Sequence, residues 1–225
     1  MKPHENDEIT REEIKKEFQL ERMILFSDAV FAIVITLMAI EIKIPETEEL
    51  TSANLGKALI HLLPTLLAYC VSFIFIGAIW YQHLKMFSLL KDYDKGLVIR
   101  NMVLLFFIGL FPFSASLITR AKGQMIPFFM YLCMILFCVI AQYVLYHYIV
   151  IGRPSIRLNT DLTEHKADLY KRKIAVMGFS ASAVLVMITY YLIPQPELKS
   201  LSTLWMCVFV IVFKIWGKKK NAKAA

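Results

Sequence analysis

The residues best suited to chemistry lie in one apolar run near the start of the chain, RMILFSDAVFAIVITLMAIEIKIP, residues 22–45. Ser27 and Asp28 stand near its beginning and Thr36 lies in its middle. A charged side chain inside a membrane helix costs at least ~2.5–3.5 kcal/mol at the centre, less near the ends, and normally has a partner. Asp28 is therefore expected either to hold neighbouring helices together or to pass protons.

The apolar residues around Thr36 repeat with the period of a helix. A spacing of three or four residues places on one stripe the side chains of Ile33, Thr36, Leu37 and Ile40. At 100° per residue, Asp28 points about 140° away from Ile33. The acid and the stripe therefore serve different neighbours, and the stripe is either a seam for helix packing or the lining of a path for ions.

The composition identifies the elements that position these residues. Of 225 residues, 58% are hydrophobic and the mean hydropathy is +0.57, above the roughly 45–50% apolar usage of soluble domains. A run of about 20 apolar residues crosses a bilayer as a helix, and the two-residue alternation of barrel strands is absent from the sequence. We predict an all-α membrane protein with six transmembrane helices, at about 23–43, 58–82, 97–118, 125–149, 172–193 and 199–216.

The net charge of +7 is explained by the membrane topology rather than by a surface that binds nucleic acid. With both termini in the cytosol, 20 of the 25 Lys and Arg residues fall on cytosolic segments or the adjoining span ends. The exceptions are Lys43, Lys57, Arg120, Lys122 and Lys199. This asymmetry agrees with the positive-inside rule, so we expect a multi-pass chain surrounded by lipid, with no nucleic-acid partner.

Nearly the whole chain is predicted to lie in the membrane, which leaves no room for a separate soluble domain. We expect a cytosolic N-terminal segment at 1–22, a six-helix transmembrane domain at 23–216 and a basic cytosolic tail at 217–225. The N-terminal segment is acidic as well as basic, which argues against a secretory signal. Within it, Ile9, Ile14 and Phe18 would give a lead-in helix one apolar edge.

Motifs of catalysis and of metal binding are absent from the sequence, which contains no CxxC, GxSxG or HExxH. The four cysteines all fall inside predicted spans, where they suit the role of small buried hydrophobes. Neither zinc nor a disulfide framework is expected. We therefore predict that the protein is not an enzyme and has no cofactor or resident metal.

Several polar residues of the second and third spans are predicted to lie at the depth of Asp28. They are Trp80, His83 and Asn101, with Arg22 nearby on the first span. Together with a serine hydroxyl beside Asp28, they would form a hydrogen-bond network that joins three helices. Alternatively, Asp28 and His83 could pass protons between them.

The stretch RMILFSDAVFAI has the form RxxxFSD followed by a small and apolar run. It resembles the first-helix signature of the transmembrane protein 175 family of potassium channels. Arg22, Phe26, Ser27 and Asp28 match that signature in full. The predicted number of spans, six, is also that of one repeat of the family. Its members occur in prokaryotic membranes and, in duplicated form, in lysosomes. The polar residues of the second and third spans lie where members of the family have the residues that contact the signature motif.

The resemblance implies a homotetramer in which four copies of the first helix line a central pore. Channels of this family lack the usual carbonyl filter, and the sequence contains no TVGYG-like loop. The positions of the family's pore layers are carried over by their distance in sequence from Asp28. They place the first constriction at Ile33 and the hydroxyl layer at Thr36. The outer apolar ring falls at Ile40, to which Leu37 also contributes. The resemblance thus implies a potassium channel, weakly selective over sodium, that is gated by apolar constrictions in a prokaryotic plasma membrane.

A second class of function stays open from the residues alone. Six spans without internal duplication would also suit a small proton-coupled secondary transporter that uses Asp28 as its proton site. Flux separates the two classes, because a channel gives a current that reverses at the potassium potential. A carrier instead shows pH-coupled uptake that saturates in its substrate.

Overall fold

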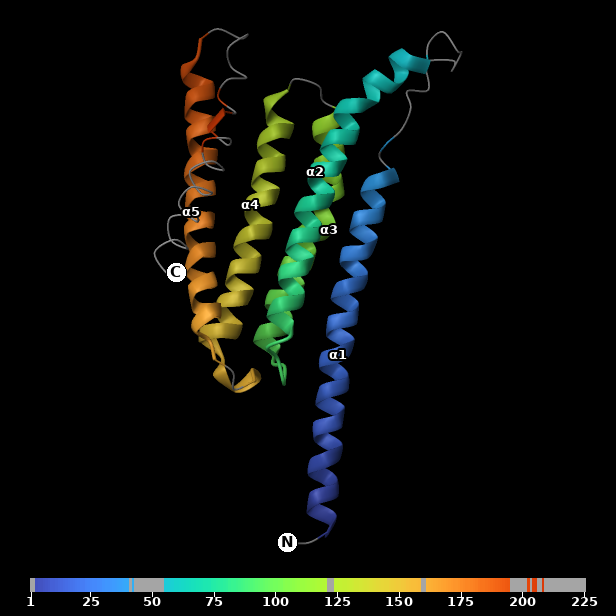
Figure 1. Ribbon diagram of the computed structural model, residues 1–225, viewed down its shortest axis with the longest axis vertical. Coiled ribbons are helices and arrows are strands. Elements are labelled where there is room, and N and C mark those ends of the chain that lie inside the picture. Colours follow the sequence, from blue (N-terminus) through green and yellow to red (C-terminus); the bar gives the residue numbers. More distant parts are fainter. Residues whose placement is uncertain are drawn as a thin grey trace. The chain divides into compact units, whose positions relative to one another are not determined.

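A computed structural model describes residues 3–40, 42, 55–120, 124–158, 161–194, 202, 204, 205 and 208. Long helices account for most of them (Figure 1). Their bounds are α1 (Pro3–Ile40), α2 (Leu55–Phe87), α3 (Lys95–Arg120), α4 (Met125–His147) and α5 (Thr163–Leu192). A π-helical turn η1 (Tyr148–Gly152) and a 3-10 turn η2 (Pro154–Ile156) follow α4. The chain divides into two compact units, residues 1–162 and residues 163–225.

Each of the five long helices in the described ranges contains an apolar stretch long enough to cross a membrane. At 1.5 Å per residue even α4, the shortest, is about 35 Å long, which exceeds the ~30 Å hydrocarbon layer. The predicted all-α membrane architecture is therefore confirmed for the first five spans. The sixth predicted span, 199–216, lies almost wholly outside the described residues.

Three helices extend beyond the spans expected from hydropathy. α1 begins at Pro3 rather than near 23, α2 ends at Phe87 rather than near 82, and α5 begins at Thr163 rather than near 172. Hydropathy detects only the membrane-embedded part of a helix. The added ends of α1 and α5 are rich in Glu, Lys and Arg, which favour helix in water as well. The domain boundary predicted at residue 22 thus falls inside a continuous helix, and the division into 1–22, 23–216 and 217–225 stays a prediction.

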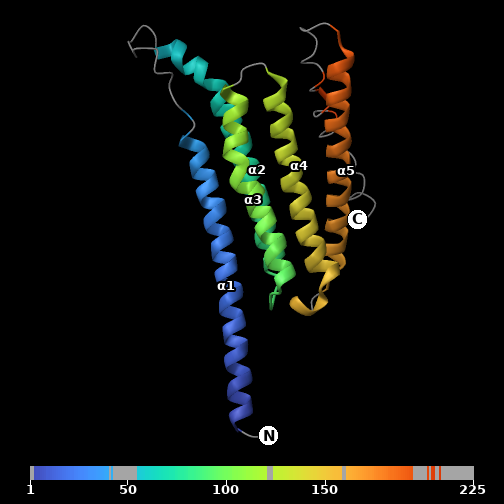
Figure 2. The same ribbon diagram turned by 180° about the vertical axis from the view of Figure 1, so that it is seen from behind.

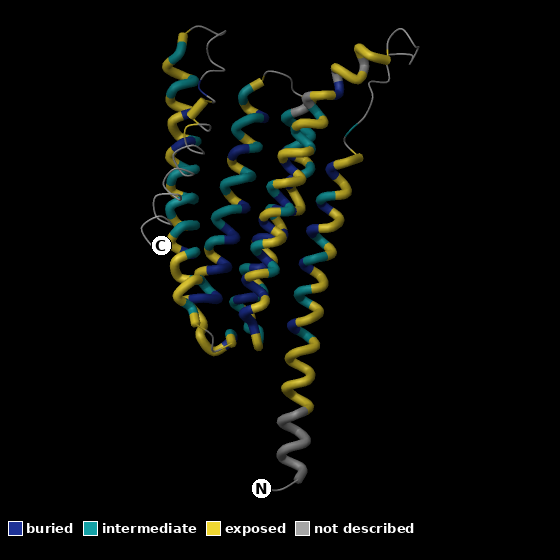
Figure 3. Tube along the Cα trace, viewed as in Figure 1, coloured by how far each residue is buried: buried dark blue, intermediate teal, exposed yellow. Residues whose placement is uncertain are grey.

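The core of the first unit lies where α1, α2, α3 and α4 face one another (Figures 1 and 2). Buried positions follow these facing sides along the helices, whereas most of the described residues in the lower part of α1 are exposed (Figure 3). The side chains that are almost fully buried include Ile76, Leu104, Ile108, Phe111 and Leu145. One face of α1 is therefore fixed against the bundle, while the described residues of its opposite face are exposed.

A cluster of basic residues marks one end of the first unit, which we name the basic end. It carries Arg22, Lys85, Lys91, Arg153 and Arg157. Backbone hydrogen bonds tie the α2–α3 turn to the segment after η2 at this end. The Leu158 N–H donates to the Leu89 carbonyl at 2.8 Å, and the Lys91 N–H donates to the Ile156 carbonyl at 3.0 Å. The two loops consequently form one braced layer beneath the helices.

Asp94 organises the start of α3 within this layer. Its carboxylate accepts the Leu97 N–H at 2.7 Å, which satisfies a free donor of the helix N-terminus. The same carboxylate accepts the Tyr148 hydroxyl at 2.6 Å and lies 3.5 Å from the Arg153 guanidinium. Partial desolvation on its own would raise the pKa of Asp94, but these hydrogen bonds and the nearby guanidinium groups lower it below its ordinary value.

The second unit, described by itself, consists of α5 and a few residues that follow it. Asp168 and Arg172 form an ion pair at 3.1 Å near the charged start of α5. The Ser182 hydroxyl donates to the Trp205 carbonyl at 2.7 Å. That bond attaches the described part of the C-terminal segment to the middle of α5.

Candidate functional site

The stripe predicted on the first helix lies on the exposed face of α1. The side chains of Ile33, Leu37 and Ile40 are 56%, 46% and 63% exposed, and Thr36 is exposed as well. Because α1 packs on the bundle through its other side, these four residues do not form a packing seam with the described helices of the first unit. The stripe is free to contact lipid, another subunit or water.

The Thr36 hydroxyl is anchored to its own helix. It lies 3.0 Å from the Ala32 carbonyl and 2.9 Å from the Ile33 carbonyl, and its hydrogen points to these acceptors. A hydroxyl that donates inward leaves its oxygen lone pairs facing outward. Thr36 can therefore present a fixed acceptor oxygen on an otherwise apolar face.

The opposite face of α1 carries a buried polar network at its basic end. The Asn101 amide donates to the Ser27 hydroxyl at 2.8 Å, and the Ser27 hydroxyl donates to the Met23 carbonyl at 2.8 Å. His83 Nε2 lies 2.9 Å from the Asn101 side-chain oxygen, so this nitrogen must be the protonated one. The bonds run in one direction from α2 through α3 to α1, which joins the three helices.

Asp28 belongs to a second, separate contact. Its carboxylate accepts the Trp80 indole N–H at 2.9 Å, at the edge of the α1–α2 contact. An indole N–H donates and does not accept, so this bond holds the helices together but offers no route for a proton. The hydrogen bond of Asp28 is thus not connected to the hydrogen bonds that link His83, Asn101 and Ser27.

Two signature residues lie away from this network. Arg22 and Phe26 are both exposed, and the Arg22 guanidinium lies 6.0 Å from the centre of the Phe18 ring. The structure thus brings Ser27, Asp28 and their partners on α2 and α3 together and leaves these two on the free face. Among the described residues, no group of three or more His, Cys, Asp or Glu side chains could hold a metal ion.

The network also has apolar neighbours that sequence reasoning missed. The His83 ring stacks on Phe87 at 3.9 Å between centroids and meets Phe31 at 5.5 Å. Phe31 follows Ser27 by four residues, so helical spacing would have placed it on the same face. Deeper in the bundle, the buried Gln142 amide donates to the Ile79 carbonyl at 2.9 Å, a contact that no spacing rule indicates.

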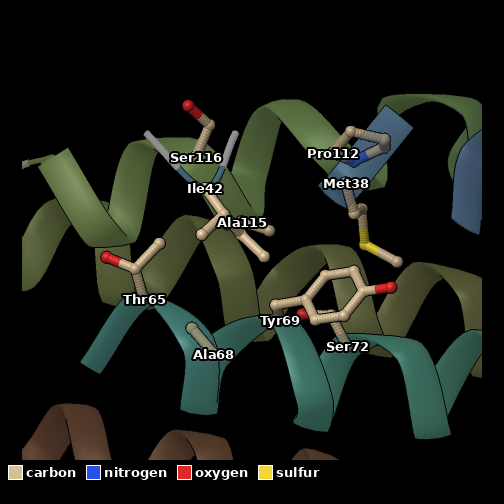
Figure 4. Close-up of a pocket in the computed structure, with 9 residues that line it drawn as sticks. All are labelled: Met38, Ile42, Thr65, Ala68, Tyr69, Ser72, Pro112, Ala115 and Ser116. Carbon is tan, nitrogen blue, oxygen red and sulfur yellow. The ribbon is translucent and has the colours of Figure 1, made fainter. Parts of the chain in front are cut away.

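A small pocket lies between α1, α2 and α3, near Pro112 (Figure 4). Its volume of about 20 Å³ is room for roughly one water molecule. Its lining comes from Met38, Ile42, Thr65, Ala68, Tyr69, Ser72, Pro112, Ala115 and Ser116. The pocket is too small to be a ligand site and lies behind the stripe rather than on it.

Comparisons with known proteins connect this geometry to a family. The family model described as "Endosomal/lysosomal potassium channel TMEM175" matches residues 22–112, which contain the signature and the network. A potassium channel of Chryseobacterium sp. is 33% identical over 158 residues, which cover 70% of this chain and 78% of that protein. A potassium channel of Chamaesiphon minutus is 36% identical over 99 residues, which cover 44% of this chain.

The fraction of each relative's length that this chain covers differs between relatives. The chain spans 49% of the Chamaesiphon protein. A chicken relative named endosomal/lysosomal proton channel TMEM175 is 24% identical over 184 residues, which cover 77% of this chain and 35% of that protein. The chain therefore spans about half or less of these two relatives, in contrast to the Chryseobacterium protein.

A solved structure shows that the fold is shared. The crystal structure of a lysosomal potassium-selective channel TMEM175 homolog from Chamaesiphon minutus superposes with a TM-score of 0.67, at 24% identity, over 87% of this chain and 98% of that chain. Together with the 33% identity to a relative of which 78% is covered, these matches show that the chain belongs to the TMEM175 potassium channel family.

Proposed function

We propose that this chain is one subunit of a homotetrameric potassium channel whose pore is lined by α1. The observation that carries the proposal is the division of α1 into two faces. The polar network fixes one face to α2 and α3, and the stripe of Ile33, Thr36 and Ile40 is left exposed on the other. A single subunit cannot enclose a path with one helix face, so closure needs several copies around an axis.

Apolar rings on such a path act as a gate. A ring of four isoleucine side chains cannot replace the water shell of an ion, so when narrow it blocks ions by dewetting, and when wide it passes them largely hydrated. Ile33 is assigned the first constriction, and Ile40 the outer one with a share for Leu37. No carbonyl filter is needed in this arrangement.

Selection of potassium is assigned to Thr36 and to ion size. Four outward-facing hydroxyl oxygens, each held by a bond to its own backbone, would offer weak acceptors to a partly dehydrated cation. The larger potassium ion loses water at lower cost than sodium, so it is favoured, although more weakly than by a ring of carbonyl groups.

The basic end is assigned to the cytosol by the positive-inside rule. Both termini are then assigned to the cytosol, and the membrane is assigned as the plasma membrane of a prokaryote. The partners in this proposal are potassium ions, lipid and three further copies of the chain. Transport rather than catalysis is the activity, with no cofactor.

The gate can be tested with Ile33→Asn in proteoliposomes. Replacing an apolar ring by amides removes a dewetting barrier worth several kcal/mol, so potassium flux should rise by about tenfold or more. Ile74→Asn makes the same substitution at an exposed position of α2, off the α1 stripe; it is the matched control and should leave flux near the parent value. Parent-level flux from a well-folded Ile33→Asn protein would remove Ile33 from the gate.

The proton-coupled transporter is the competing function, and Asp28 decides between the two. If Asp28 only accepts the Trp80 bond, Asp28→Asn keeps an acceptor oxygen and retains potassium current with an unchanged reversal potential. A carrier would lose its proton-coupled uptake in the same variant. Measuring potassium, sodium and proton flux side by side also tests whether protons permeate, as the name of the chicken relative suggests for that protein.

A further inference from the structure

The part of α1 beyond the apolar span carries exposed apolar side chains in water. We name residues 11–22 the extension. Eight of its twelve side chains are charged, yet Ile14 and Phe18 are 60% and 58% exposed. Because α1 runs uninterrupted from Pro3 to Ile40 (Figure 1), the extension leaves the membrane along the direction of the span. It therefore cannot lie flat in the headgroup layer as an interfacial helix would.

The exposed side chains of the extension are in register with the proposed pore stripe. Steps of four, four and three residues connect Ile14, Phe18, Arg22, Leu25, Ala29, Ile33, Thr36 and Ile40, all of them exposed. At 100° per residue, all eight point within about 60° of the direction of Thr36. An eleven-residue repeat of this kind keeps a seam aligned between helices that are nearly straight or wind right-handed. One continuous face therefore runs from the stripe into the extension.

Charges flank this face with opposite signs. Relative to the direction of Phe18, Lys15 and Arg22 lie on one side, and Glu17 and Glu21 lie on the other. In a ring of parallel helices, one side of each helix meets the opposite side of the next. Along the axis, Lys15 and Glu17 differ in height by about 3 Å, and Arg22 and Glu21 by about 1.5 Å. A ring of copies would thus place cations beside anions at each contact.

We infer that the extension is a second subunit interface, in which copies of residues 11–22 pack as a parallel bundle in line with the pore. Ile14 and Phe18 form its core, and Lys15 and Glu17 pair between neighbouring copies. The inference rests on the proposed function, since it needs copies of α1 around one axis. It goes beyond that function because it assigns an assembly contact to a segment outside the membrane. This segment takes no part in ion selection.

Cysteine cross-linking of the full chain in liposomes tests the interface. Phe18→Cys, treated with a short bismaleimide, should give dimers and higher multiples of the subunit on a denaturing gel. Lys16→Cys is the matched control, because Lys16 is exposed but points about 160° away from Phe18; it should give only the background of the parent chain. Equal yields from the two variants would overturn the inference.

Charge reversal adds a test that folding defects cannot imitate. In the Phe18→Cys chain, Lys15→Glu should lower the cross-linked fraction by about fivefold, the effect of turning an exposed ion pair into a repulsion. Adding Glu17→Lys should restore the fraction, and failure of this rescue would count against the pairing. Ile40→Cys separates the two proposals. If it cross-links and Phe18→Cys does not, the pore stands and the extension interface fails, whereas failure of both removes the shared axis itself.

Discussion

The packing of Gly96 against Tyr148 at the basic end gives a quantitative prediction. Gly96, in the first turn of α3, lies against the Tyr148 ring. A Cβ at this position would be 2.2 Å from the Tyr148 hydroxyl oxygen and 2.8 Å from the ring carbon that bears it. Both distances are below the contact limit for carbon, so Gly96→Ala must displace Tyr148.

The cost follows from what holds Tyr148 in place. Its hydroxyl donates to Asp94 at 2.6 Å, and the Arg100 guanidinium lies 4.0 Å from the ring centre. Losing a hydrogen bond to a charged group costs about 1.5–3 kcal/mol, less here because Asp94 is partly exposed, and the cation–π contact adds about 0.5–1 kcal/mol. The better helix propensity of alanine returns at most about 1 kcal/mol. We expect a net loss of roughly 1–3 kcal/mol.

The assay is thermal unfolding of the detergent-purified full chain. At about 2–4 °C per kcal/mol for a chain of this size, the melting temperature of Gly96→Ala should fall by roughly 3–10 °C. Gly109→Ala, in the same helix, is the matched control, since nothing lies within 4 Å of its added Cβ. That variant should match or slightly exceed the parent. The reasoning is refuted if the two alanine variants melt together, or if Gly96→Ala costs as much in a Tyr148→Ala background.

Two further predictions concern the pore and the braced layer. Thr36→Val keeps the shape of the stripe but removes the outward hydroxyl oxygen, so the reversal potential under mixed potassium and sodium should move toward equal permeability; an unaltered reversal potential would remove Thr36 from selection. Because hydrogen bonds and nearby guanidinium groups lower the pKa of Asp94 below the ordinary value of an aspartate, its contribution to stability should be present from neutral pH down to that ordinary value. The contribution should disappear only as the pH falls further, through the lowered pKa. Asp94→Asn should therefore melt lower than the parent at pH 7, and the two melting curves should converge only in stronger acid.

The sequence predicted the spans well because hydropathy measures what the membrane requires of a helix. It did not show how far α1 and α5 extend beyond their spans, since charged helical segments outside the membrane carry no hydropathy signal. Contacts between distant residues were harder to predict. Asn101 was expected near Ser27 from depth alone, but the stacking of Phe87 on His83 and the bond from Gln142 to the Ile79 carbonyl depend on how helices rotate against one another.

The polar pairs at the basic end show the same limit. Asp94 and Tyr148 are 54 residues apart, and nothing in their local sequence links them. Tyr148 lies where α4 passes into η1, so their meeting depends on how the end of α4 packs against the start of α3. The signature stretch, by contrast, could be interpreted from spacing because all of its residues lie on one helix.

The rotation of α1 is the physical link between the buried network and the proposed pore. Ser27 and Thr36 are nine residues apart, which at 100° per residue makes them point in opposite directions. When Asn101 holds Ser27 against α3, Thr36 is turned away from the bundle by geometry alone. The Trp80 bond to Asp28 adds a second constraint at another angle, so the helix cannot turn about its axis without breaking one of the two. In the proposed channel, the polar residues of the signature thus govern an ion path that they do not line, because they decide which side chains α1 presents to the proposed axis.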